Sequence, residues 1–217
     1  MKKIISGIIV LAGALLSPQI TQAQGTITYL SSLGTSTGSP SVGSDSWLAA
    51  EFSVGSNVGG YTLDSIQLGM ADATGNPSGF TAMLYTAIIA GAVLPGSSLG
   101  TLNGSLNPVT SGTYTYTPAS NLILLPGLYF IVLTAGTTVA NGAYEWSESA
   151  FPPSSSGGWS DGNGVLHSSN GISGWSVTPY LGIAQFAINA TAVPEPSSLG
   201  LLVLGGLGLL WHRRKLR

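Results

Sequence analysis

The central part of this 217-residue chain contains no lysine and no arginine. All six basic residues lie near the two ends, so residues 24–192, with seven acidic residues and no basic one, carry a formal charge of −7 when histidine is neutral. Ion pairs with Lys or Arg therefore cannot hold this segment together, and its stability must come from apolar burial and backbone hydrogen bonds. The lack of positive charge also excludes the phosphate contacts on which nucleic-acid binding depends.

The same segment alternates β-forming residues and shows no amphipathic helical stripe. Turn-forming residues recur roughly every 8–12 positions, a spacing typical of sandwiches and barrels. The pattern predicts an all-β fold, with a single β-sandwich or jelly-roll domain over residues 24–192. The expected strands are 47–54, 61–68, 80–86, 99–102, 113–117, 122–125, 128–134, 143–147 and 181–188.

Local sequence features refine this expectation. The apolar side chains of 61–68 change faces at Ser65, which predicts a β-bulge. Turn chemistry at 72–77 and at Pro95-Gly96 predicts chain reversals there. Residues 128–134 are the most apolar stretch and are the predicted centre of the sheet, whereas 151–174 is predicted to be rich in loops.

The N-terminus has the order of a secretory signal peptide. Lys2 and Lys3 precede an apolar run over 4–16, and Thr21 and Ala23 are small residues before the expected cleavage point. This order predicts a signal peptide over residues 1–23, removed after Ala23. The chain has no cysteine, so disulfide bonds are absent.

The C-terminus has three parts in a fixed order. Pro194-Glu195-Pro196 is stiff and extended, because proline fixes φ and disfavours helix in the residue before it. An uncharged apolar run and a basic cluster, Arg213-Arg214-Lys215, follow. A helix over 197–211 is roughly 22 Å long, shorter than the roughly 30 Å hydrocarbon core. The order predicts a transmembrane helix that is either a permanent anchor or a sorting tail. Its apolar residues are Leu199, Leu201, Leu202, Val203, Leu204, Leu207, Leu209, Leu210 and Trp211.

On these three parts, residues 193–217 closely resemble the PEP-CTERM sorting signal of bacterial exported proteins. The resemblance implies that a membrane protease of the exosortase type processes the chain near Pro194-Glu195-Pro196. It also implies an exported chain that the C-terminal helix holds in the inner membrane before processing. The processed chain is then expected at the cell surface or in the extracellular matrix.

Residues 24–192 resemble, more loosely, the extracellular β-sandwich domains of the choice-of-anchor type, which bacteria pair with varying C-terminal anchors. The likeness lies in 47–52, 61–68, 83–85, the Leu-Pro-Gly sequence at 94–96, the Gly-x-Tyr strand start within 125–130, and Tyr144-Glu-Trp146. It implies a β-sandwich, and no shared catalytic residues come with it.

Candidate catalytic residues are few. Ser36 and Ser98 each lie in a G-x-S-x-G sequence, but a nucleophile elbow needs a strand–turn–helix setting and a histidine base. No helix is predicted after either serine, and His167 is the sole histidine of 24–192. We therefore expect no catalytic residues, and a hydrolase is the least favoured alternative. One histidine and no cysteine cannot supply a zinc site, and no cofactor is expected.

The carboxylates give two weaker patterns. Glu145 and Glu148 have an odd separation, which places them on opposite faces of a strand, so a solvated edge is favoured over a glycosidase pair. Asp161-Gly-Asn163 resembles the opening of a calcium loop, but Val165 stands where the EF-hand pattern needs an oxygen ligand. A tight turn without a metal is expected there, with calcium binding by converging carboxylates as the alternative.

Aromatic residues give the clearest binding pattern. Trp146, Trp159 and Trp175 lie in or near the predicted loop-rich segment, where exposed rings would stack on sugars. Burial in the core is the favoured alternative, because tryptophan is highly buried on average. The leading functional hypothesis is an exported, non-catalytic protein of the cell envelope or matrix with a role in surface or biofilm architecture. The alternative is a module that binds exopolysaccharide.

Overall fold

Antiparallel strands make up most of the computed structural model, which describes residues 25–177 and 182–194. The predicted signal peptide and the tail from Glu195 onward lie outside the described residues. The described residues contain no α-helix, which confirms the all-β prediction. The elements are β1 (Ile27–Ser31), β2 (Ser41–Val42), β3 (Trp47–Val54), β4 (Tyr61–Gly75), β5 (Thr81–Ile89), β6 (Val93–Asn103), β7 (Gly112–Pro118), β8 (Ile123–Leu124), β9 (Gly127–Thr134), the 3₁₀ turn η1 (Val139–Asn141), β10 (Gly142–Trp146), β11 (Glu148–Ser149), β12 (Ser154–Ser155), β13 (Ser160–Ser168), β14 (Ser176–Val177), β15 (Ile183–Ala184) and β16 (Phe186–Ala192).

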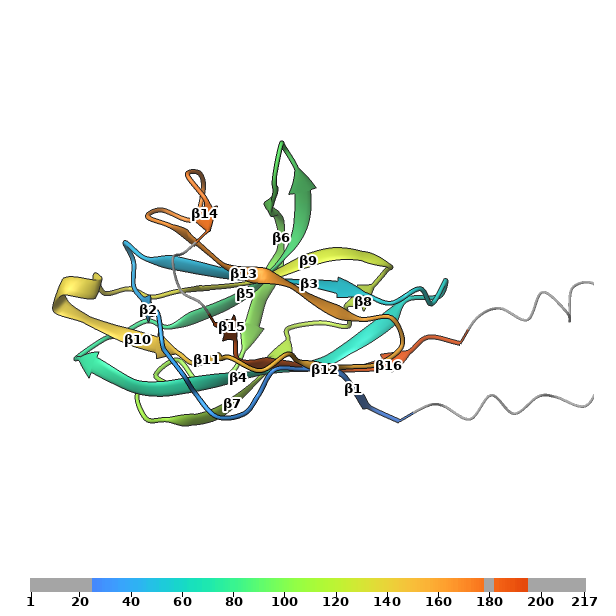
Figure 1. Cartoon of the computed structure of the whole chain (residues 1–217), viewed down its shortest axis with the longest axis horizontal. Helices are drawn as coiled ribbons and strands as arrows, with labels where there is room; N and C mark the ends of the chain where they lie inside the picture. The colour runs from blue at the N-terminus through green and yellow to red at the C-terminus, as the bar shows by residue number, and fades with distance from the viewer. Residues whose placement is uncertain (1–24, 178–181, 195–217) are drawn as a thin grey trace, which may run out of the picture.

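Fourteen of these strands form one sheet that curls until its two halves face each other (Figure 1). The first half has the order β12-β1-β16-β4-β7, with β8 and β10 also paired to β4, and β2 paired to β10. The second half has the order β6-β5-β9-β3-β13-β14. β6 and β7 join the halves, because Leu102 lies opposite Pro118 and Asn103 opposite Thr117.

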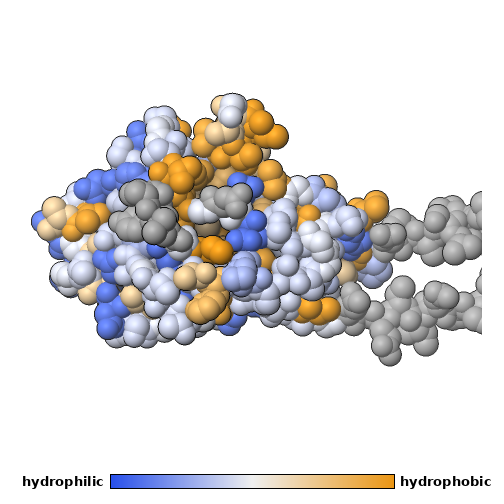
Figure 2. All heavy atoms as spheres, viewed as in Figure 1, coloured by the Kyte–Doolittle hydropathy of each residue, from blue (hydrophilic) through white to orange (hydrophobic). Residues whose placement is uncertain are grey.

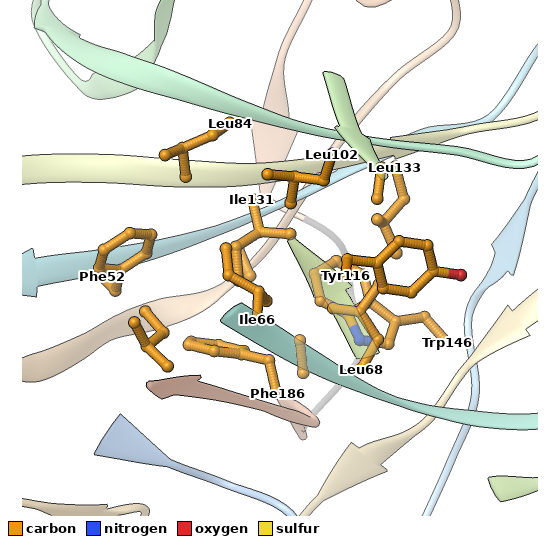
Figure 3. Close-up of a cluster of buried hydrophobic side chains, with 14 of the residues drawn as sticks. Phe52, Ile66, Leu68, Leu84, Leu102, Tyr116, Ile131, Leu133, Trp146 and Phe186 are labelled. Carbon is orange, nitrogen blue, oxygen red and sulfur yellow. The ribbon is translucent and has the colours of Figure 1, made fainter. Parts of the chain in front are cut away.

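Alternate side chains of both halves meet between the two layers (Figure 3). On β3 the even-numbered side chains, including Leu48 and Phe52, belong to this core, and Ile66, Leu68 and Phe186 join it from the other layer. Burial of each large apolar side chain contributes about 1.5–3 kcal/mol. The core therefore supplies the stability that ion pairs with basic residues cannot.

β9 is buried on both faces. Ile131 and Leu133 face the main core, whereas Phe130 and Val132 face a second apolar cluster on the outside of the same layer. β9 lies between β5 and β3 in its half of the sheet. The prediction that 128–134 occupies the centre is therefore confirmed for this layer.

The predicted bulge in β4 is also confirmed. Ser65 lies opposite Asn189, but the next pair joins Leu63 to Ala190, so Asp64 is an extra residue on β4. The buried positions change from Tyr61 and Leu63 before the bulge to even-numbered ones after it. One extra residue thus accounts for the switch of apolar faces, because side chains alternate with a period of two.

The turn predicted at Pro95-Gly96 is wrong, and the turn predicted over 72–77 is wrong as far as the end of β4. Residues 72–75 continue β4, which ends only at Gly75, where the backbone has a positive φ of 63°. Pro95 lies within β6, opposite Ala87 of β5. Between Val93 and Thr101, β6 pairs with β5 alone among the described strands, and an edge strand with register shifts tolerates a proline.

The loop-rich prediction for 151–174 is wrong over β13, a nine-residue strand of which six residues pair with β3. The ladder is irregular between Asp161 and Val165, and Gly164 has a φ of 88°. This irregularity interrupts the alternation that would have identified a strand. The expected strand 181–188 is divided, because β15 pairs with β11, whereas β16 pairs with β1 and β4. Leu181 lies outside the described residues.

The main core predicts a large effect for Phe52→Ala. The Phe52 ring is fully buried and stacks on Trp159, with the ring centroids 6.1 Å apart. We expect its removal to lower the free energy of unfolding by about 3–5 kcal/mol, measured by urea denaturation of the mature protein. Phe151→Ala is the matched control, because Phe151 is 65% exposed, and its effect should stay within about 0.5 kcal/mol. Equal effects of the two changes would contradict this account of the core.

Candidate functional site

The end of β16 leads directly to the predicted sorting motif. Val193 follows the strand, and its amide donates a hydrogen bond to the Gly60 carbonyl at 3.0 Å. The side-chain amide of Asn57 donates to the carbonyls of Gly60 and Val193, at 2.7 and 3.0 Å. The domain therefore holds the chain as far as Val193, and Pro194, the first motif residue, is exposed.

The turn that holds Val193 depends on glycine. Gly60 has a φ of 76°, which disfavours other residues. A β-carbon on Gly59 would lie 2.8 Å from the Val193 carbonyl oxygen, so the close approach requires a residue without one. The Asn-Val-Gly-Gly sequence is a visible turn signal, but its contact with residue 193 depends on the fold.

The remainder of the predicted tail lies outside the described residues. This applies to Glu195, Pro196, the apolar run from Leu199 to Trp211, and the basic cluster. It also applies to the predicted cleavage site at Ala23. In residues 25–177 and 182–194, no helix has the length and hydropathy to cross a bilayer.

Two of the three candidate sugar-binding tryptophans are buried, which confirms the favoured interpretation for them and rules out the stacking role there. Trp146 is completely buried, and its indole N–H donates to the Gln185 carbonyl at 3.0 Å. Trp159 is 2% exposed and stacks between Tyr29 and Phe52. Trp175 is half-buried and packs on the outer apolar cluster. Trp175 thus remains the one of the three with an accessible ring.

Glu145 is buried, contrary to the prediction of a solvated edge. Its Oε1 accepts hydrogen bonds from the hydroxyls of Ser41 and Thr74, at 2.8 and 3.4 Å. Burial raises the pKa of Glu145, and these hydrogen bonds partly offset the rise. The neighbours are hydroxyls because the surrounding strands contain no basic residue.

Glu148 is also buried, with 3% exposure, and its Oε1 has no hydrogen-bond partner among the described residues. Its side chain lies over two glycines, since β-carbons on Gly38 and Gly182 would lie 3.2 and 3.0 Å from Oε2. Burial raises the pKa of this carboxyl as well. Glu145 and Glu148 contact different neighbours, since hydroxyls surround the first carboxylate and glycines lie against the second.

The candidate nucleophiles and base are not brought together. Ser98 lies in β6 and His167 in β13, and β5, β9 and β3 separate these strands. Four strand spacings amount to about 19 Å, too far for a serine–histidine hydrogen bond. Ser36 lies in the loop before β2, where its hydroxyl donates to the Gly38 carbonyl at 3.0 Å. Neither serine precedes an α-helix in the described part of the chain.

The predicted tight turn at Asp161-Gly-Asn163 is wrong, because these residues form the irregular part of β13. Burial raises the pKa of the Asp161 carboxyl. Within the described ranges, no three His, Asp or Glu side chains gather as a metal site would require.

The buried glutamates predict an unusual dependence of stability on pH. Their folded-state pKa values are raised, so the folded chain binds these protons more tightly than the unfolded chain. The unfolding free energy is then largest below the ordinary glutamate pKa and falls as pH rises through the folded values. We expect a higher Tm at about pH 4 than at neutral pH.

Glu148→Gln should reduce this difference in Tm, because the amide does not titrate. Asp45→Asn removes the same charge from an exposed site while keeping the oxygen that accepts from the Val139 amide. This variant controls for general charge repulsion and should leave most of the difference in place. A Tm that falls on acidification of the wild-type protein would contradict the prediction.

Comparison with known families identifies the tail. Residues 192–215 match the PEP-CTERM protein-sorting motif. No curated protein and no solved structure matches the chain. The resemblance of the tail to the PEP-CTERM signal is confirmed, whereas the likeness of 24–192 to choice-of-anchor domains stays a prediction. The sorting motif implies an exported chain that is anchored in a membrane before an exosortase processes it.

Proposed function

We propose that this chain is a non-catalytic protein of the cell envelope or extracellular matrix, delivered by its PEP-CTERM tail and used in surface or biofilm architecture. The observation that carries the proposal is the match at 192–215, which begins at the last residue of β16. The all-β domain is the part that remains after processing, and the tail determines where it is delivered.

The exosortase is proposed to bind the extended tripeptide Pro194-Glu195-Pro196. Its two prolines keep these residues out of a helix and suit them to a cleft that binds extended peptides. The apolar run after Leu199 serves as a temporary membrane span, and the basic cluster at Arg213 stays on the cytoplasmic side. The short span fits a temporary stop better than a permanent anchor.

The use of buried polar groups supports a structural role. The Gln185 side-chain amide donates to the carbonyls of Gly34 and Glu148, at 3.1 and 3.3 Å. The Ser168 hydroxyl donates to the Ser173 carbonyl at 2.6 Å and accepts from the Gly171 amide at 3.0 Å. These side chains hold loops in place, because they satisfy backbone groups that the strand ladders leave unpaired.

Replacement of Pro194-Glu195-Pro196 by three alanines should leave export intact and block tail processing. The variant should therefore fractionate with the membrane, and its intact mass should include residues up to Arg217. Wild-type protein from the same host is the control, and its intact mass should lack the basic end. A wild-type mass that still includes Arg217 would show that the tail is a permanent anchor.

Polysaccharide binding is the second candidate function, and the outer face of the second layer favours it. Trp47 and Trp175 are half-buried there, against the cluster that contains Phe130 and Val132. The indole N–H of Trp47 donates to the Ser44 carbonyl at 3.2 Å, and this contact fixes the ring. Partly exposed, fixed aromatic rings are suited to stacking on sugars.

If this face binds polysaccharide, Trp175→Ala should weaken binding to the exopolysaccharide of the producing organism about fivefold, which corresponds to the loss of one aromatic contact. Affinity electrophoresis in gels containing that polysaccharide measures the effect. Phe151→Ala is the control, since it removes an exposed aromatic ring elsewhere. If the polysaccharide slows the migration of neither the wild type nor the two variants, polysaccharide binding is contradicted as a function.

A further inference from the structure

Four exposed apolar side chains surround the point where the described chain leaves the domain. They are Ile27, Val58, Ile123 and Leu125, with exposed fractions of 38%, 76%, 46% and 55%. We name this group the apolar collar. Single exposed apolar residues are ordinary on protein surfaces, so the significance of the collar depends on where its members gather.

Strand pairing places the collar beside Val193. Ile27 lies in β1, which pairs with β16 just before its end, with Ile27 opposite Ala190. Val58 lies in the turn from Asn57 to Gly60 that holds Val193. Ile123 and Leu125 flank Leu124, which pairs with Tyr61, and a β-carbon on Gly60 would lie within 3.1 Å of both side chains. Figure 2 shows apolar patches at this end of the domain.

The chain beyond Val193 limits how far the collar can lie from a membrane. Only residues 194–198 separate Val193 from Leu199, the first apolar residue of the proposed span. Six Cα–Cα steps reach about 20 Å when fully extended. The headgroup region of one leaflet is roughly 5–8 Å thick. In the anchored chain the collar is therefore the part of the described domain that the tether holds nearest to the lipid.

The chemistry of the collar indicates how it would meet that surface. Residues 24–192 contain no Lys or Arg, so attraction to anionic headgroups cannot contribute. Aliphatic side chains are favourable at the boundary between headgroups and acyl chains, where apolar faces insert about 5–10 Å. Val58 and Leu125 are the most exposed members, so they are the side chains that would insert.

We propose that the apolar collar rests on the outer leaflet of the membrane while the tail anchors the chain, with Val58 and Leu125 inserted among the lipids. This inference rests on the proposed function, because the sorting tail must first anchor the chain. Contact between collar and lipid would hold Pro194 at the membrane surface, where a membrane-embedded exosortase acts.

The absence of cysteine from the sequence makes a direct test simple. Val58→Cys and Leu125→Cys each introduce one site for a fluorescent bimane label. Leu106→Cys is the matched control, because Leu106 is 72% exposed and lies near Phe80, at the other end of β4 from Tyr61. The full chain with its tail intact is reconstituted into phosphatidylcholine vesicles that carry a nitroxide quencher on a fraction of the headgroups.

We expect quenching at positions 58 and 125 to exceed that at 106 by about threefold, since insertion places those labels within about 10 Å of the headgroups. In the Val58→Ser, Leu125→Ser background, a label at Ile123→Cys should lose most of its quenching. The pair Leu106→Ser, Val109→Ser is the control background and should have no effect on that label.

Three negative outcomes have different meanings. If the chain fails to float with the vesicles, the tail is not an anchor, and both the proposed function and the collar proposal fail. If the chain floats but labels at 58, 125 and 106 are quenched equally, the collar proposal alone is overturned. The collar proposal is also overturned if the labels at 58 and 125 change their exposure only when an exosortase is present. The collar would then contact the protease instead of lipid.

Discussion

β16 lies between β1 and β4, so the last described strand completes the half of the sheet that the first one begins. Thr28 and Asn189, which share a side-chain hydrogen bond, are 161 positions apart in the sequence. Pairing over such separations is slow, because the entropy of loop closure is lost before the contacts form. The core therefore cannot close until the residues next to the tail are in place. The same pairing, with Ile27 opposite Ala190, brings the start of β1 and the end of β16 to one end of the domain (Figure 1).

The absence of Lys and Arg makes the buried carboxylates the least stabilised groups of this domain. Buried carboxylates are commonly stabilised by Lys or Arg, but this domain has neither. Glu145 is compensated by two hydroxyls, whereas Oε1 of Glu148 has no described partner. Each buried carboxyl costs less when it is protonated. Apolar packing such as that around Phe52 must offset this cost at neutral pH.

Sequence reasoning located β3, β9 and the bulge of β4, but it failed over β13. β3 has the predicted bounds, because every even-numbered side chain of the strand faces the main core and the period of two is not interrupted. β13 was missed because its ladder is irregular between Asp161 and Val165, which conceals the period of two. Burial of Trp146 was the favoured prediction, but the hydrogen bond from its indole N–H to the Gln185 carbonyl depends on tertiary packing. The sorting tail could be predicted because its motif, apolar run and basic cluster are consecutive in the sequence. The hydrogen bond from Asn57 to the Val193 carbonyl could not, because it joins distant segments.

The sorting motif begins two residues after Ala192, where the last described strand, β16, ends. Among the described residues, Val193 is the last whose backbone groups bond to the domain, and the tripeptide begins at the next residue. Cleavage within or after the tripeptide would therefore leave every described strand and every described core side chain in place. The same arrangement leaves almost no spacer between domain and motif, so a protease that binds the tripeptide must come close to the Asn57 turn. A longer linker would let the protease bind farther from the Asn57 turn, but it would also separate the collar from the membrane. The closeness of the protease to the domain and of the collar to the lipid therefore both follow from where β16 ends.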